Sequence, residues 1–134
     1  MRYHIDTDFL VVALGRAGKE RKRLLAIADS EAHLQMSAVA WYEFARGPRT
    51  PEQLAVARSL LDDEDGVVPF AESLAERAGE VFRRLGSPRR RAADIAIGVT
   101  AAALGAVLLT RNRADFQGIP DLELEGARGG PGGA

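Results

Sequence analysis

The sequence contains no cysteine among its 134 residues. This absence excludes a disulfide framework, a thiolate zinc site and a cysteine nucleophile together, and it fits a reducing compartment. Lysine is scarce as well, since Lys19 and Lys22 are the only lysines among 18 basic residues. The positive charge is therefore carried by arginine, which makes bidentate phosphate contacts that lysine cannot make. Codon bias explains the same arginine usage equally well.

The sequence also has little excess charge of either sign, because its net charge is −1. Any contact with nucleic acid must therefore come from a local patch of positive charge. One stretch of the chain offers five basic residues with no acid between them: Arg83, Arg84, Arg89, Arg90 and Arg91. A solvated loop is the alternative explanation for this stretch.

No apolar run is long enough to cross a bilayer. The longest one extends from Ile95 to Leu109, which is shorter than the roughly 20 residues that a membrane helix needs. It is predicted to be a buried helix that leads into a buried strand. No apolar segment of sufficient length follows Met1-Arg2, so we expect no signal peptide, no membrane contact and a cytoplasmic protein.

Strand-like and helix-like segments alternate along the chain. Strands are predicted at residues 3–5, 34–36, 66–70, 107–109 and 122–124, and helices at residues 9–13, 20–29, 38–46, 51–63, 74–85 and 92–104, with a short helical turn at 113–116. This alternation predicts an α/β fold, a parallel sheet of four to five strands with helices on both faces. Its length predicts one domain, which we place at residues 1–125. The glycine-rich residues 126–134 are expected to be a disordered tail.

Two acids stand near the ends of the first two predicted strands. Asp6 directly follows the first strand, and parallel sheets bind ligands at the carboxyl ends of their strands. A helix N-cap explains the position of Asp6 equally well. Glu43 follows Trp41-Tyr42 in the helix after the second strand, and Ser37 is expected to cap that helix.

Two more acids lie in the second half of the chain. Asp94 is the only charge in residues 92–109, and a buried carboxylate is costly unless it is paired, hydrogen-bonded or bound to metal. Its alternative is a first-turn residue favoured by the helix dipole, which fits less well if the helix begins at Pro88. Asp115 follows the fourth strand, and a capping box begun by Asn112 is its alternative.

Taken together, the acids suit a hard divalent cation. Mg²⁺ and Mn²⁺ prefer oxygen ligands, and few of these need to come from the protein. The sequence offers no zinc-type set of histidine and cysteine ligands. We therefore predict that Asp6, Glu43, Asp94 and Asp115 hold one or two such ions.

Four segments of the chain resemble PIN domains. Residues 5–10, 37–47, 91–97 and 108–116 are similar, in order and spacing, to the segments that carry the four acids of that family, and the resemblance extends from Tyr3 to Leu124. The most similar subgroup is the VapC-type toxins of toxin–antitoxin pairs. Asp8 departs from the pattern, where a small polar residue is expected, and some relatives carry an acid in place of Asn112. Both residues are further candidate metal ligands.

The resemblance implies a sheet ordered 3-2-1-4-5, in which Asp6, Asp94 and Asp115 converge between strands one and four and Glu43 reaches in from the neighbouring helix. It also implies a ribonuclease that a cognate antitoxin holds inactive and that pairs into a homodimer. The bound metal would lower the pKa of a water and neutralise charge on the scissile phosphate. Some of the arginines are expected to contact RNA: Arg46, Arg89, Arg90, Arg91, Arg111 and Arg113.

Other functions remain alternatives at this point. They are an RNA-binding module without turnover, a nuclease for structured DNA, and an unrelated α/β domain whose acids are all helix caps. Other chemistry has little support, because no phosphate-binding glycine loop follows a strand and neither Ser37 nor Thr110 has a suitable histidine partner for a triad.

A few remaining residues have a structural and a functional explanation. His4 and His33 lie in or beside predicted strands, where packed or surface histidines are more common than catalytic ones. Trp41 and Tyr42 are expected to pack, with base stacking as the alternative. The apolar helical segments 9–14 and 54–61 are expected to leave a groove that a helix of a partner protein fills.

Overall fold

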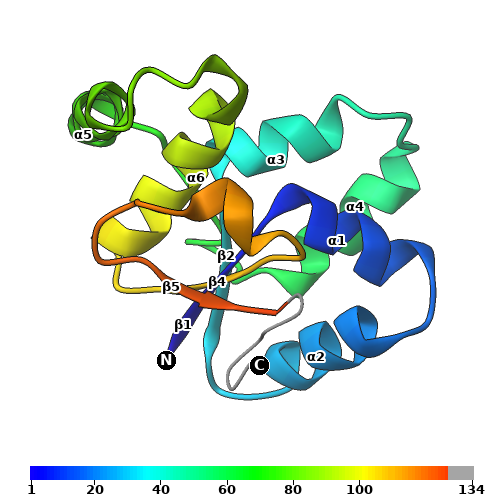
Figure 1. The fold of residues 1–134 in the computed structure, drawn as a ribbon. Coiled ribbons are helices and arrows are strands. Elements are labelled where there is room, and N and C mark those ends of the chain that lie inside the picture. Colours follow the sequence, from blue (N-terminus) through cyan, green and yellow to red (C-terminus); the bar gives the residue numbers. More distant parts are fainter. Residues whose placement is uncertain (127–134) are drawn as a thin grey trace.

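A five-stranded parallel sheet forms the centre of the computed structural model, which describes residues 1–126 (Figure 1). The strands are β1 (Arg2–Ile5), β2 (His33–Ser37), β3 (Val67–Val68), β4 (Val107–Leu109) and β5 (Glu123–Glu125). Their order across the sheet is β3-β2-β1-β4-β5, and every neighbouring pair is parallel. The predicted α/β class and strand order are confirmed.

Helices cover the sheet on both sides, with α1, α2 and α4 on one side and α6 on the other (Figure 1). The α-helices are α1 (Thr7–Gly15), α2 (Lys19–Ala28), α3 (Ala38–Ala45), α4 (Pro51–Leu60), α5 (Glu72–Arg84) and α6 (Ala92–Ala103), and the 3₁₀-helices are η1 (Arg89–Arg91) and η2 (Arg113–Phe116). Short loops between strand and helix leave the strand ends open at one edge, where parallel sheets place their ligands.

The register of the two central strands decides what meets at that edge. Tyr3 of β1 pairs with Val107 of β4, and Ile5 pairs with Leu109. The amide of Asp6 continues the ladder by donating to the carbonyl of Leu109 at 2.9 Å. The residues that follow the two strands, Asp6 and Thr110, therefore emerge side by side.

The long apolar run is a buried helix followed by a buried strand, as predicted. Residues 95–101 of α6 and all of β4 are buried. In residues 1–126, no helix has the length and apolar character that crossing a membrane requires. α6 thus belongs to the core beneath the sheet edge.

Two elements are shorter than the sequence predicts. α4 ends at Leu60 instead of residue 63, and β3 contains only Val67 and Val68. For α4 the cause is Asp62, whose amide donates to the carbonyl of Leu34 at 2.9 Å and whose carboxylate accepts from the Leu34 amide at 3.1 Å. Because these bonds tie the segment to β2, the chain leaves the helix early. The predicted tail at 126–134 lies, from residue 127 onward, outside the described residues.

Candidate active site

Asp6 lies at the junction of β1 and α1 and is 7% exposed. Its Oδ2 accepts a hydrogen bond from the buried hydroxyl of Thr110 at 3.1 Å, and the oxygen of that hydroxyl accepts from the amide of Asn112 at 3.0 Å. Asp6 stands at the N-cap position of α1, but its side chain makes no capping hydrogen bond. The carboxylate is therefore oriented across the sheet edge toward β4, and the cap explanation is not what the structure supports.

Glu43 reaches the same region from α3. Ser37 begins this helix, and its hydroxyl accepts from the amide of Ala40 at 3.0 Å, as predicted. The hydroxyl of Thr7 donates to Oε1 of Glu43 at 2.9 Å and lies 3.2 Å from the carbonyl of Ala40. Thr7 thereby links the carboxylate of Glu43 to the start of α1, beside Asp6.

Asp94 is half-buried in the first turn of α6, which begins at Ala92 after the 3₁₀ turn η1. The helix does not begin at Pro88, so the position of Asp94 fits the helix dipole. Its surroundings nevertheless oppose ionisation: burial raises the pKa of Asp94 to about 6, and the charges of Asp115 and Glu43 add to the rise. The helix dipole therefore favours the ionised form of Asp94, whereas burial and the neighbouring acids oppose it.

Asp115 is half-buried in η2, after β4. The capping-box alternative is not observed, because the side chain of Asn112 makes no capping bond to η2. The amide of Asp115 instead donates to the backbone carbonyl of Asn112 at 3.2 Å. The carboxylate of Asp115 is consequently not needed to begin the turn.

Electrostatic interaction connects the four acids. Burial and then the charge of Asp94 raise the pKa of Asp6 to about 7, while Asp115 and Glu43 act on Asp94. Asp94 is thus within reach of the charges of the other three acids. Among residues 1–126, no three acidic or histidine side chains lie close enough together, as oriented, to hold one ion at once.

The chemistry of this cluster fits a divalent cation. Its donors are all carboxylate oxygens, and burial followed by mutual repulsion raises the pKa values of Asp6 and Asp94. A bound cation would supply positive charge that offsets this repulsion.

Comparison with known proteins gives one family. The model of the PIN domain matches residues 3–122. This chain belongs to the PIN domain family. The resemblance found in the sequence is thereby confirmed. No curated protein matches the chain in sequence.

Solved structures of similar fold span nearly the whole PIN domain. VapBC2 from Rickettsia felis, bound to a DNA fragment from its promoter, is 20% identical and covers 93% of this chain and 98% of that chain, with a TM-score of 0.70. A toxin–antitoxin complex from Klebsiella pneumoniae is 23% identical and covers 90% of this chain and 94% of that chain, with a TM-score of 0.68. VapBC-1 from nontypeable Haemophilus influenzae is 26% identical and covers 93% of this chain and 97% of that chain, with a TM-score of 0.64.

One candidate ligand of the PIN domain is occupied by an ion pair. Asp8 accepts from Nη1 of Arg111 at 3.1 Å, and Nε of the same arginine lies 3.5 Å from Oε2 of the buried Glu20. Arg111 thus holds the Asp8 carboxylate, whose charge makes a small contribution to the raised pKa of Asp6. Its role as a metal ligand, and that of Asn112, stays a prediction.

The predicted RNA-binding arginines fall into two groups. Three of them bind other groups of the protein. Arg111 pairs with Asp8 and Glu20. Arg113 donates to the carbonyl of Leu124 at 3.4 Å, and Arg91 donates to the carbonyls of Asp115 and Gln117. Arg89 and Arg90 are exposed, as is Arg46. The guanidinium of Arg46 stacks 5.4 Å from the ring of Tyr42 and lies 4.0 Å from Glu43.

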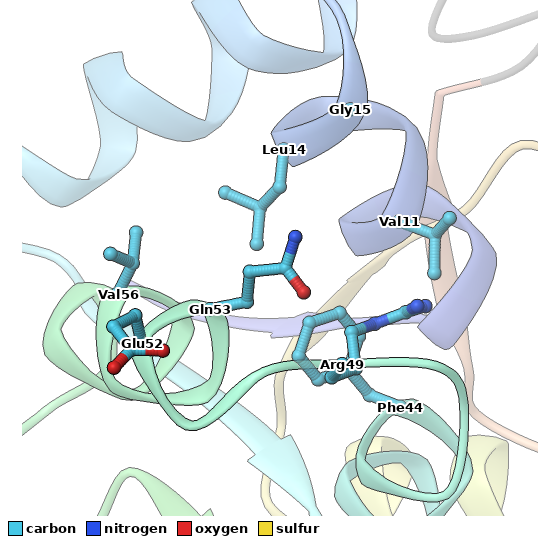
Figure 2. Close-up of a pocket in the computed structure, with 8 residues that line it drawn as sticks. All are labelled: Val11, Leu14, Gly15, Phe44, Arg49, Glu52, Gln53 and Val56. Atoms are coloured by element: carbon cyan, nitrogen blue, oxygen red, sulfur yellow. The ribbon is translucent and has the colours of Figure 1, made fainter.

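An apolar groove of about 360 Å³ lies between α1 and α4, and none of the four acids lines it (Figure 2). Val11 and Leu14 come from α1, and Gln53 and Val56 come from α4. The guanidinium of Arg49 stacks over the ring of Phe44 at 4.5 Å inside it. The two helices are those whose composition predicted an open groove.

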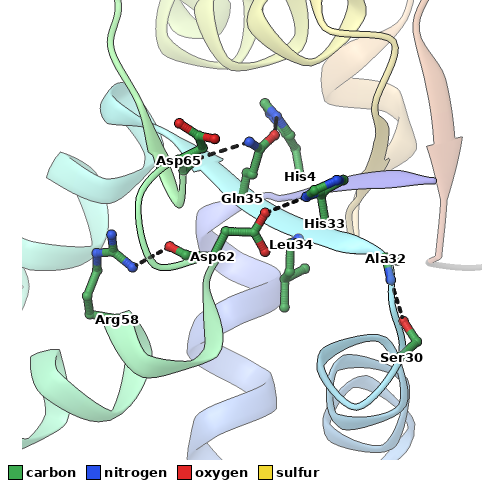
Figure 3. Close-up of polar contacts among 9 residues, drawn as sticks. All are labelled: His4, Ser30, Ala32, His33, Leu34, Gln35, Arg58, Asp62 and Asp65. Atoms are coloured by element: carbon green, nitrogen blue, oxygen red, sulfur yellow. Dashed lines mark hydrogen bonds and ion pairs between the residues drawn. The ribbon is translucent and has the colours of Figure 1, made fainter.

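His4 links β1 to β2, and His33 links β2 to the loop after α4 (Figure 3). His4 is fully buried, its Nε2 lies 3.0 Å from Oε1 of Gln35, and Gln35 donates to the carbonyl of Asp65 at 3.0 Å. Burial lowers the pKa of His4 to about 4, so its ring is neutral at pH 7. His33 is exposed and pairs with Asp62 at 2.7 Å. Both placements agree with the structural explanation.

Sequence reasoning missed Thr7 and Thr110, whose hydroxyls bind Glu43 and Asp6. A signal for both was available in the sequence. Thr7 follows Asp6 just after the first predicted strand, and Thr110 directly follows the fourth. Thr110 was considered only as a nucleophile that lacked a histidine, and not as a donor to a carboxylate.

Proposed function

We propose that this PIN domain is a divalent-metal-dependent endoribonuclease and the toxin of a toxin–antitoxin pair. The observation that carries the proposal is the coupling of four carboxylates at the end of β1 and β4, where the pKa of Asp6 rises to about 7 and that of Asp94 to about 6. Groups with perturbed pKa values concentrate at functional sites. The family supports hydrolysis of nucleic acid, and the neighbours named as toxin–antitoxin complexes support the toxin assignment.

Asp6, Glu43, Asp94 and Asp115 would hold Mg²⁺ or Mn²⁺. When bound, the ion would lower the pKa of a water and neutralise charge on the scissile phosphate. The protein orients the carboxylates: Thr110 directs Asp6, and Thr7 directs Glu43. The hydroxyl of Thr110 favours the ionised carboxylate of Asp6, which is the form that ligates metal.

RNA would approach the acids over exposed arginines. Arg46 adjoins Glu43, and Arg89 and Arg90 precede the helix that carries Asp94. A negatively charged site repels a polyanion, so arginines around it are needed to bring the backbone close. The exposed ring of Tyr42 beside Arg46 would offer a surface on which a base can stack.

A cognate antitoxin would restrain the enzyme, with one of its helices in the groove between α1 and α4. The groove is apolar, open to solvent and flanked by helices, which suits an amphipathic helix with anchors at i, i+4 and i+7. A basic residue of the partner that reached the acids would compete with metal. A homodimer, which the PIN resemblance implies, is part of this proposal.

The decisive experiment is incubation of the purified protein with mixed RNA, and separately with single-stranded DNA, in Mn²⁺ and in EDTA. We expect RNA cleavage in Mn²⁺, none in EDTA, and none by the Asp115→Asn variant. We expect that variant to keep the fold, because the carboxylate of Asp115 is not needed to begin η2, so it controls for contaminating ribonuclease. Binding without cleavage would favour the RNA-binding module, and cleavage of DNA alone would favour a DNA nuclease.

A further inference from the structure

Arg91 joins two segments that are distant in sequence. Its Nε donates to the carbonyl of Asp115 at 3.1 Å, and its Nη2 donates to the carbonyl of Gln117 at 2.5 Å. The side chain is half-buried, unlike those of Arg89 and Arg90, which are exposed. One guanidinium therefore binds both carbonyl groups that flank the buried Phe116.

The segment that Arg91 binds has little internal support. η2 is a four-residue 3₁₀-helix, a conformation with poor hydrogen-bond geometry. The amide of Gln117 lies 3.4 Å from the carbonyl of Ala114, and the side chain of Asn112 provides no cap. Gly118, with φ of +83°, ends the segment. The buried side chain of Phe116 anchors η2 in the core. The backbone of η2 is held by Arg91, through the carbonyls of Asp115 and Gln117.

Arg91 also lies beside Asp94 in the chain, at the start of the same helix. Arg91 is the N-cap of α6, and Asp94 lies in the first turn of that helix. The charge of Arg91 lowers the pKa of Asp94, against the larger effects of burial, Asp115 and Glu43. Arg91 thus stands between the backbone that carries Asp94 and the backbone that carries Asp115, and it offsets part of the repulsion between them.

We propose that Arg91 is a positioning residue, which sets the distance between Asp94 and Asp115, and that it is not an RNA contact. The inference rests on the proposed nuclease function. The guanidinium is needed for its shape: Nε and Nη2 form a planar fork that reaches two carbonyls at once, whereas a lysine ammonium is a single point charge. A lysine at this position keeps the charge and loses the fork.

The chain supplies a matched control one residue away. Arg90 belongs to the same 3₁₀ turn and is exposed. If Arg90 contacts RNA phosphate, its loss weakens RNA binding and lowers the salt dependence by about one unit of log–log slope. If Arg91 positions the acids, its replacement by lysine changes metal binding and turnover and leaves the salt dependence unchanged.

The test compares Arg91→Lys, Arg91→Ala and Arg90→Ala with the wild type. Hydrogen exchange of the metal-free proteins reports on residues 113–118, calorimetry reports Mn²⁺ affinity, and kinetics at two salt concentrations separate kcat from KM. For Arg91→Lys we expect faster exchange confined to residues 113–118, Mn²⁺ affinity reduced about tenfold, and a lower kcat at unchanged KM. For Arg90→Ala we expect a higher KM and wild-type exchange and Mn²⁺ affinity.

Two results would overturn the inference. One is an Arg91→Lys variant with the exchange, Mn²⁺ affinity and kcat of the wild type; the other is an Arg91→Ala variant that changes only KM and its salt dependence, as Arg90→Ala does.

A wild-type protein that binds no Mn²⁺ and cleaves no RNA would instead overturn the proposed function. In that case, the exchange of residues 113–118 in the metal-free Arg91→Lys variant decides alone whether Arg91 holds η2. If Arg91→Ala does not fold, the lysine variant carries the test.

Discussion

At the scale of single residues, Asp94 is a half-buried carboxylate that faces the charges of Asp115 and Glu43. We expect Asp94→Asn to abolish cleavage, because an amide is a poorer ligand for a hard cation than a carboxylate. The same change removes a repelled charge, so the melting temperature in EDTA should equal or exceed that of the wild type. Thermal melts with and without Mn²⁺ check this prediction. A large drop in melting temperature would assign Asp94 a structural role.

Asp6 makes the stability of the metal-free protein depend on pH. Its pKa rises from 3.8 to about 7 in the folded state, mainly through burial. Between about pH 4 and 7 the folded state binds more protons than the unfolded state, so the contribution of Asp6 to stability falls as pH rises and levels off above about 7. Asp6→Asn should therefore exceed the wild type in melting temperature by more at pH 8 than at pH 5.

The buried His4 requires a control in that comparison. Its pKa falls to about 4, so it contributes stability that rises with pH, opposite in sign to Asp6. Both proteins contain His4, and its effect cancels when their melting temperatures are subtracted in EDTA. A difference that stays constant from pH 5 to pH 8 would contradict the raised pKa of Asp6.

Single residues also show where prediction from the sequence ends. The four acids could be chosen because each stands beside a predicted strand or in an apolar helix. The ion pairs of Arg111 with Asp8 and Glu20 could not, because the three residues come from separate segments that only the folded chain brings together. For the same reason, the hydrogen bonds of Arg91 and Arg113 to backbone carbonyls could not be predicted, and an RNA contact of Arg113 stays a prediction.

At the scale of secondary-structure elements, the cap of α3 places Glu43. Ser37→Ala removes the acceptor for the amide of Ala40, and loss of such a cap costs about 1 kcal/mol. We expect this loss of stability in denaturant titration, together with a lower kcat, because the helix that carries Glu43 frays where Thr7 contacts it.

The capping box of α4 gives a control for that prediction. Thr50 accepts from the amide of Gln53 at 3.1 Å, and α4 carries none of the four acids. Thr50→Ala should lose a similar free energy of unfolding and keep the kcat of the wild type at a temperature where both proteins are folded. Equal effects of the two variants on kcat would mean that the cap of α3 acts only through overall stability.

Prediction of elements succeeded where local signals agreed and failed where distant contacts decided. The apolar run of α6 and β4 and the cap at Ser37 are local features, and both are observed. The end of α4 depends on the bonds from Asp62 to Leu34 of β2, so the helical pattern alone extended it too far. The order of the strands came from the PIN resemblance and not from periodicity.

At the scale of the whole molecule, the groove and the acids occupy different places, so partner binding and catalysis can be separated. Val56 is 56% exposed in the groove wall, and Leu104, 39% exposed, lies at the end of α6 and outside the groove lining. Val56→Asp should abolish co-purification of the proposed antitoxin, sought by co-expression with an adjacent short reading frame, and keep RNA cleavage, because a charge in an apolar groove costs binding energy.

Co-expression followed by size-exclusion chromatography checks this prediction, with Leu104→Asp as the control that should still retain the partner. Elution of the wild type at twice its mass in the absence of partner would support the homodimer. If the wild type elutes without any partner and its producing cells grow normally, with all four acids intact, the toxin assignment is wrong and a housekeeping nuclease replaces it.

The strand order has a consequence for timing. Asp6 directly follows the central strand β1, yet its hydrogen-bond partner Thr110 is 104 positions further along the chain. A ribosome adding about 5 to 20 residues per second needs roughly 5 to 20 s to produce that second residue. Throughout this interval β1 has no β4 to pair with, and Asp94 and Asp115 have yet to be made or placed. If the chain is the toxin proposed above, it is inactive while it grows, and an antitoxin that is already present has those seconds in which to meet it.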